Sequence, residues 1–99
     1  MPIRHVVIFK FKPDAQEAIA SAKAALLALQ GKIDGLTSMT FGETFTTDRA
    51  NGYTHCLVSD HGSKEALQAY AEHADHQAII TTHIRPNLEA PPMALDFEY

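Results

Sequence analysis

The chain has 99 residues, which is the length of one domain. Its formal net charge is −4, with 8 Lys and Arg against 12 Asp and Glu. An acidic surface without a run of basic residues repels phosphate backbones, so nucleic-acid binding is not expected. No apolar run approaches the roughly 20 residues of a membrane span, and the opening segment lacks the continuous apolar core of a signal peptide. The single cysteine, Cys56, excludes an intramolecular disulfide and is interpreted as a small buried hydrophobic residue. We therefore expect one cytoplasmic domain over residues 1–99, with no membrane partner.

The first predicted element is a strand over residues 3–11, "IRHVVIFKF". β-Branched and aromatic residues dominate it and alternate between two faces. One face carries Ile3, His5, Val7, Phe9 and Phe11, whereas the other carries Val6 and Ile8. Because its middle is apolar on both faces, the pattern predicts a central strand that is covered on both sides.

A helix follows, beginning at an N-cap Asp14 with Glu17 in the position of a capping box. Apolar residues spaced by three or four give it a buried stripe: Ile19, Ala22, Leu26, Leu29 and Ile33. Gly31 or Gly35 is expected to end this helix.

Two further strands are predicted over residues 36–45 and 53–60, joined by the turn-rich segment "TTDRANG". Two strands separated by such a loop are typical of a hairpin.

The second half of the chain reads as a helix, a second helical piece and a final strand. Ser63 is the predicted N-cap of the helix, whose predicted buried stripe is Leu67, Tyr70 and Ala71. The second piece covers residues 76–88 and is expected to kink or end at Pro86. The closing strand places four apolar residues on one face: Met93, Leu95, Phe97 and Tyr99.

This order, β-α-β-β-α-β, predicts the α+β class and a ferredoxin-like fold: a four-stranded antiparallel sheet with the helices on one face. The expected strand order is 4-1-3-2, with the first and third strands in the centre. The face away from the helices would then expose Val6, Ile8, Cys56 and Val58. Such a patch is unusual for a monomer, so we expect a homodimer that buries it by packing two sheets face to face.

Histidines and one tyrosine are expected to converge between sheet and helices. His5 and His55 lie on strand faces with apolar neighbours, and "AYAEHADHQAI" sets Tyr70, His73 and His76 three residues apart. A lone histidine in such a strand is usually a core residue that is satisfied by a carbonyl or a water. Several titratable groups buried together cost stability unless they are paired, so a functional interpretation of the cluster stands beside the structural one. His61 and His83 lack such company and are expected at the surface.

Three interpretations of the cluster stay open. In the first, a neutral imidazole removes a proton from a carbon acid while a phenol donates to the developing oxyanion. In the second, His73, Asp75 and His76 bind a divalent ion, although histidines three apart on a short helix are a weak signal and no cysteine supports a zinc site. In the third, the chain is a compact dimer whose polar seam only fixes its packing. No metal or cofactor is expected.

Four stretches together resemble the stress-responsive A/B barrel domain family: "IRHVVIFKFKPDA", "GYTHCLV", "AYAEHADHQA" and "LDFEY". The resemblance runs from residue 3 to 99 and implies a ferredoxin-like protomer in a dimeric α+β barrel. Members include plant stress proteins and polyketide-cyclising enzymes of the olivetolic acid cyclase type. In the latter, a tyrosine and a histidine promote an aldol ring closure in a cavity between sheet and helices.

Carried onto this chain, those catalytic roles fall on Tyr70 and His76, with His5, His55 and His73 lining the pocket. The leading hypothesis is a stress-related protein that binds a small apolar or aromatic ligand. The alternative is a cyclase-like lyase with His76 as base and Tyr70 as oxyanion donor. A cofactor-independent monooxygenase is a further alternative by analogy of fold alone.

Overall fold

The computed structural model describes residues 1–99, and its elements follow the predicted order. The strands are β1 (Ile3–Phe9), β2 (Leu36–Glu43), β3 (His55–His61) and β4 (Met93–Glu98). The α-helices are α1 (Gln16–Leu27), α2 (Lys64–Glu72) and α3 (Ala74–Ile79). A π-helical turn at Ile80–Ile84 and a 3-10 turn at Arg85–Asn87 continue α3 toward β4.

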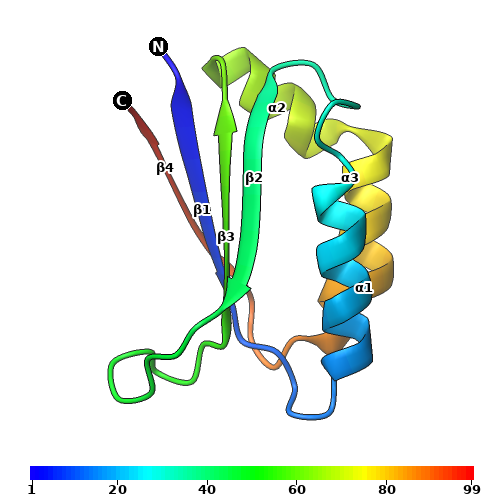
Figure 1. The fold of residues 1–99 in the computed structure, drawn as a ribbon, viewed down its shortest axis with the longest axis vertical. Helices are drawn as coiled ribbons and strands as arrows, with labels where there is room; N and C mark the ends of the chain where they lie inside the picture. The colour runs from blue at the N-terminus through cyan, green and yellow to red at the C-terminus, as the bar shows by residue number, and fades with distance from the viewer.

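The four strands form one antiparallel sheet in the order β2-β3-β1-β4, as predicted. All helices lie on one face of this sheet, and the other face is open (Figure 1). In the register of the sheet, His5 of β1 lies opposite Ser59 of β3 and Asp96 of β4. The ferredoxin-like α+β fold is therefore confirmed, with β1 and β3 at its centre.

The layer between sheet and helices is the hydrophobic core, and its helical side includes α1 and the residues that follow it. Four residues of the predicted stripe are buried and Ile19 packs against them: Ala22, Leu26, Leu29 and Ile33. The predicted cap of α1 is wrong. Its N-cap residue is Ala15, and no side chain caps the helix. Asp14 lies one residue too early for its carboxylate to accept from the first turn.

Two glycines turn the chain between α1 and β2. Gly31 has φ +82° and Gly35 has φ +87°, a region that side chains other than glycine rarely adopt. α1 itself ends at Leu27, before either glycine. A Cβ at Gly35 would lie 2.5 Å from the Cβ of Ala66 in α2, whereas one at Gly31 would meet nothing within 4 Å. Gly35 therefore permits a close approach between this turn and α2.

α2 begins as predicted, because the Ser63 hydroxyl accepts a hydrogen bond from the Ala66 backbone N–H at 3.1 Å. It ends at His73, whose ψ of 134° is extended and separates α2 from α3. Pro86 lies in the 3-10 turn, where the helical segment ends as expected.

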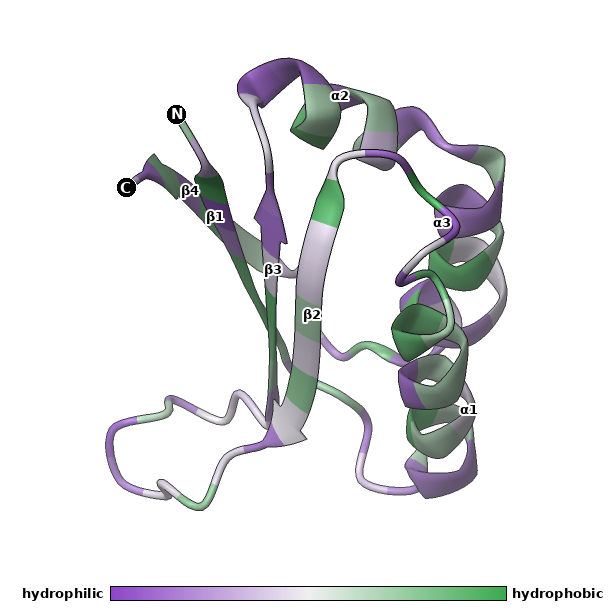
Figure 2. Cartoon of the chain, turned by 45° about the horizontal axis from the view of Figure 1, so that its top comes forward, coloured by the Kyte–Doolittle hydropathy of each residue, from purple (hydrophilic) through white to green (hydrophobic).

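The middle of the open face of the sheet is apolar. Val6 lies opposite Val58 and Leu95 in the register of the sheet, and Ile8 lies opposite Cys56 and Met93. Hydrophobic colour runs along the middle of β1 and β3 (Figure 2), as expected for strands with apolar residues on both faces. The β4 side chains on this face stay exposed: Met93 55%, Leu95 74%, Phe97 50% and Tyr99 49%. The prediction that the helices leave an apolar face uncovered is thus correct.

Cys56 is half-buried on this open face rather than in the core. Burial raises the pKa of its thiol, which does not favour a thiolate nucleophile. None of the helices combines the length and the apolar composition that crossing a bilayer requires.

Candidate functional site

His5 and Asp96 form a side-chain pair on the helix-facing side of the sheet. The Nδ1 atom of His5 is hydrogen-bonded to Oδ1 of Asp96, across the β1–β4 pairing. The His5 side chain is 17% exposed and that of Asp96 is 44% exposed, because β4 is an edge strand. A carboxylate on one ring nitrogen fixes the orientation of an imidazole and leaves the other nitrogen for a further partner.

Tyr70 of α2 lies at the centre of the cluster and is 1% exposed. Its ring centroid is 4.2 Å from that of His76, 4.7 Å from that of His61 and 6.2 Å from that of His5. Burial raises the pKa of Tyr70, since a phenolate would be poorly solvated there. The hydroxyl therefore keeps its proton at neutral pH and can act as a hydrogen-bond donor.

His76 of α3 is half-buried and lies against the Tyr70 ring. Burial lowers the pKa of His76, so the imidazole is neutral at pH 7. Its Nδ1 lies 3.4 Å from the Ala71 carbonyl oxygen, which can only accept, and this contact favours the tautomer with the ring proton on Nδ1. The lone pair is then on Nε2, which is the arrangement of a potential base.

His61 was expected at the surface, and this prediction is wrong. The residue is 0% exposed, and its ring lies 6.1 Å from the His5 ring as well as against Tyr70. β3 extends to His61, one residue beyond the predicted end, so the alternation that turns Leu57 and Ser59 inward also turns His61 inward. Burial lowers the pKa of His61. Its Nε2 is 2.9 Å from the Ser59 hydroxyl, whereas its buried Nδ1 has no hydrogen-bond partner.

Two predicted pocket residues lie away from this cluster. His55 is opposite Phe9, four positions along β1 from His5, which is about 13 Å in a strand. Its ring packs against Phe11 and Phe41 instead, with centroids 5.2 and 5.6 Å apart.

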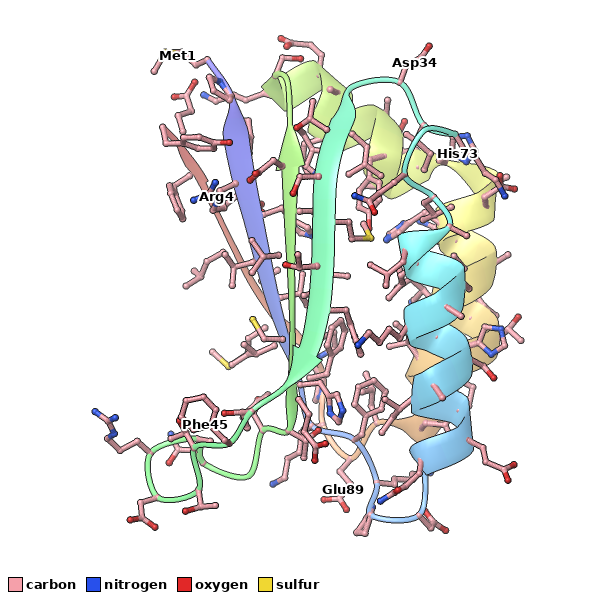
Figure 3. The ribbon with its side chains drawn as sticks, in the orientation of Figure 1. Met1, Arg4, Asp34, Phe45, His73 and Glu89 are labelled. Atoms are coloured by element: carbon pink, nitrogen blue, oxygen red, sulfur yellow. The ribbon has the colours of Figure 1, made fainter.

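His73 lies at the turn between α2 and α3 (Figure 3), where its Nδ1 accepts a hydrogen bond from the Asp75 backbone N–H at 3.1 Å. It therefore acts as the N-cap of α3. His83, also expected at the surface, lies in the π-helical turn and is partly buried.

The structure thus brings together His5, Tyr70 and His76 of the predicted set and adds His61 and Asp96. We name these five residues the Tyr70 cluster. It combines a protonated phenol, the neutral imidazoles of His61 and His76, and the hydrogen-bonded His5–Asp96 pair, which is a set of groups that can bind and move protons. No three His, Cys, Asp or Glu side chains of the chain are arranged to hold a metal ion.

Comparison with known proteins identifies the family of the chain. The model of the Dabb family, the stress responsive A/B barrel domain, matches residues 3–99. A stress-response A/B barrel domain-containing protein of Arabidopsis thaliana is 30% identical over 84 residues, which are 85% of this chain and 32% of that protein. The chain therefore spans about a third of the length of this curated relative.

Solved structures share the fold over its whole length. A dimeric ferredoxin-like protein of unknown function from Thermobifida fusca YX has TM-score 0.84 and 28% identity, covering 100% of this chain and 92% of its own. The hydroxynitrile lyase of Passiflora edulis has TM-score 0.83 and 21% identity, covering 97% of this chain and 91% of its own, a likeness that shows the fold alone. The family match and the observed fold agree, and the chain belongs to the stress-responsive A/B barrel domain family.

Proposed function

We propose that the chain binds a small apolar or aromatic molecule that carries a carbonyl or hydroxyl oxygen, at the Tyr70 cluster. The observation that carries this proposal is the contact between Tyr70 and His76, whose ring centroids are 4.2 Å apart. The apolar layer around them suits a hydrophobic ligand body, and the phenol and imidazole suit its polar oxygen. The partly exposed His5, His76 and Asp96 form the side from which a ligand approaches.

The buried Nδ1 of His61 supports a ligand at this position. An unpaired hydrogen-bonding atom in a protein interior costs about 1–3 kcal/mol. In native structures such atoms are almost always satisfied by a protein group, a water or a bound partner. His61 Nδ1 lacks a partner within the chain, and its ring borders both Tyr70 and His5.

A second candidate function is an aldol-type cyclase or lyase reaction at the same pair. In this reaction Nε2 of His76 removes a proton from the carbon beside a carbonyl, and the Tyr70 hydroxyl donates a hydrogen bond to the enolate oxygen. The nucleophilic carbon forms a bond with a second carbonyl carbon, whose oxygen takes the proton back from His76. The lowered pKa of His76 and the proton on its Nδ1 favour this candidate, because they leave Nε2 free to act as a base.

The test of ligand binding uses acetophenone and acetylacetone as probes, an aromatic ketone and a β-diketone. In titrations followed by two-dimensional amide NMR, we expect saturable shifts around Tyr70 and His76 in the wild type. In His76→Ala we expect affinity to fall roughly tenfold, the effect of losing one hydrogen bond and its packing. Equal affinities for the wild type and His76→Ala would reject a site that is centred on this residue. Turnover of a β-keto substrate distinguishes the second candidate from binding alone.

The dimer is part of the same proposal. Two sheets packed face to face would cover Val6, Ile8, Leu95 and Phe97, which no helix covers. The Thermobifida fusca protein, 28% identical, is described as dimeric. The β2–β3 loop carries Phe45, which is 97% exposed and lies near the lower end of the sheet in Figure 3. We therefore infer a homodimer through the open sheet face.

The cellular setting also stays a proposal. A cytoplasmic location is supported by the single free cysteine. A role in stress response is supported by the family and by the Arabidopsis relative, of which the chain covers a third.

A further inference from the structure

A second polar and aromatic site lies at the opposite end of β1 from His5. A cavity of about 390 Å³ opens between the first half of α1 and the ends of β2 and β3. This volume is in the range of small-molecule pockets. Its lining includes His55, Phe11 and Phe41. We name it the His55 cavity.

The floor of the His55 cavity is aromatic. The His55 ring stacks on Phe41 at 28° between ring planes and meets Phe11 edge-on at 88°. Burial lowers the pKa of His55 and outweighs the opposing charge of Glu43, while Lys23 adds a smaller lowering effect, so the imidazole is uncharged at pH 7. Three uncharged rings in contact favour a flat aromatic ligand, which can pack against their faces and edges.

The rim of the His55 cavity is charged. It carries Lys12, Lys23 and Glu43, so positive charge exceeds negative by one. The Lys12 Nζ donates to the Pro86 carbonyl at 3.2 Å, and Pro86 itself does not line the cavity. An ammonium group binds a carboxylate or a phosphate through a charge-assisted hydrogen bond. With a net excess of one positive charge, the rim matches a singly charged anion best.

We propose that the His55 cavity is a second binding site, separate from the Tyr70 cluster, for a small aromatic carboxylate. The ring of the ligand packs on the aromatic floor formed by Phe11, Phe41 and His55. Its carboxylate lies at the rim between Lys12 and Lys23, away from Glu43. The site needs neither Tyr70 nor His76, so the two proposals stand or fall separately.

The test titrates the full chain with phenylacetate and follows the amide spectrum. We expect saturable shifts at Gly42, Thr54 and His55 but not around Tyr70. Benzylamine carries the opposite charge on a ring of the same size, and we expect it to bind at least tenfold more weakly. Phenyl phosphate separates a carboxylate site from a general anion site. Shifts that centre on Tyr70, equal binding of benzylamine or no saturable shift would each overturn the proposal.

Matched variants locate the ligand on the chain. Ala20 and Ala24 are both exposed on α1, but only Ala20 lines the cavity. We expect Ala20→Trp to fill the cavity and abolish phenylacetate binding, whereas Ala24→Trp leaves it unchanged. Lys23→Gln should weaken binding roughly three- to tenfold, because it removes one ion pair. Lys32→Gln serves as its control, since Lys32 is exposed and does not line the cavity. Equal affinities within both pairs of variants would place the ligand elsewhere.

Discussion

Tyr70 and His76 pack ring against ring, with centroids 4.2 Å apart, although they belong to two different helices. His73 makes this contact possible. Its extended backbone ends α2, and its imidazole accepts from the Asp75 N–H to begin α3. Of the two histidines in "HADH", the first therefore positions the second, which explains why His73 lies outside the Tyr70 cluster.

Replacing Tyr70 by Phe separates a structural role from a functional one. The ring of Tyr70 is fully packed, and burial is the only influence on its pKa, with no hydrogen bond holding the hydroxyl. We expect Tyr70→Phe to change the free energy of unfolding by less than about 1 kcal/mol in urea denaturation. The affinity for acetophenone, measured by amide NMR titration, should fall clearly in the same variant. A large loss of stability with unchanged ligand response would show that Tyr70 serves packing alone.

The stability of the chain should fall as the pH drops from 7 to 5. Burial lowers the pKa of His55, His61 and His76 in the folded chain below the usual 6.5, so the unfolded chain takes up protons first. Their stabilising contribution is complete above about pH 6.5 and is lost as the pH falls below it, by up to about 1.4 kcal/mol per pH unit for each group. Arg4 lowers the pKa of Asp60. The stabilising contribution of this carboxylate is lost only as the pH falls below the usual 3.8, which is outside the range from 7 to 5.

The variant His61→Phe tests the origin of this pH dependence. It removes one of the buried titrating groups and the unpaired Nδ1 while keeping a flat ring at the position. Urea denaturation at pH 7, 6 and 5 should show a shallower loss of stability than in the wild type. If the free energy of unfolding falls equally with pH in the two proteins, His61 does not contribute to the pH dependence.

Leu95→Glu should disrupt the proposed homodimer. Leu95 is 74% exposed on the open face and lies opposite Val6, so a carboxylate there would be buried only in the dimer. We expect light scattering to give half the wild-type mass, with monomer stability changed by no more than about 0.5 kcal/mol. Val6→Glu should act in the same direction, and Ala24→Glu on the helical surface is the control. A dimer that survives both changes would place the interface on another surface.

Gly35→Ala should destabilise the chain more than Gly31→Ala. Both substitutions force a side chain into positive φ, which costs about 1–2 kcal/mol. Only at Gly35 does the new methyl group also collide with Ala66, which adds about 1–3 kcal/mol. Thermal or urea unfolding of the two variants compares them directly. Equal losses of stability in the two variants would indicate that α2 moves away from residue 35 at little energetic cost.

The sheet and the α1 stripe could be predicted from the sequence because they depend on local periodicity. β1 has apolar residues on both faces, and the chain places it at the centre of the sheet. The cap of α1 could not be predicted in this way, since Asp14 and Glu17 fit a capping box one residue away from the true start at Ala15. A shift of one residue is enough to remove a cap.

The composition of the Tyr70 cluster was harder to predict, because it depends on register and on the ends of elements. His5 and His55 share a face of the sheet, but the antiparallel register separates them by four positions. His61 had a usable signal: continuing the alternation of Leu57 and Ser59 by one step turns it inward. Asp96 could be paired with His5 only once the β1–β4 register was known.

The pairing of β1 with β4 has a consequence for biosynthesis. His5 is translated 91 positions before its partner Asp96. Until then the nascent chain exposes one side of β1 to other polypeptides, and neither the sheet nor the Tyr70 cluster is complete. Synthesis of β4 is thus the step that completes both the four-stranded sheet and the Tyr70 cluster.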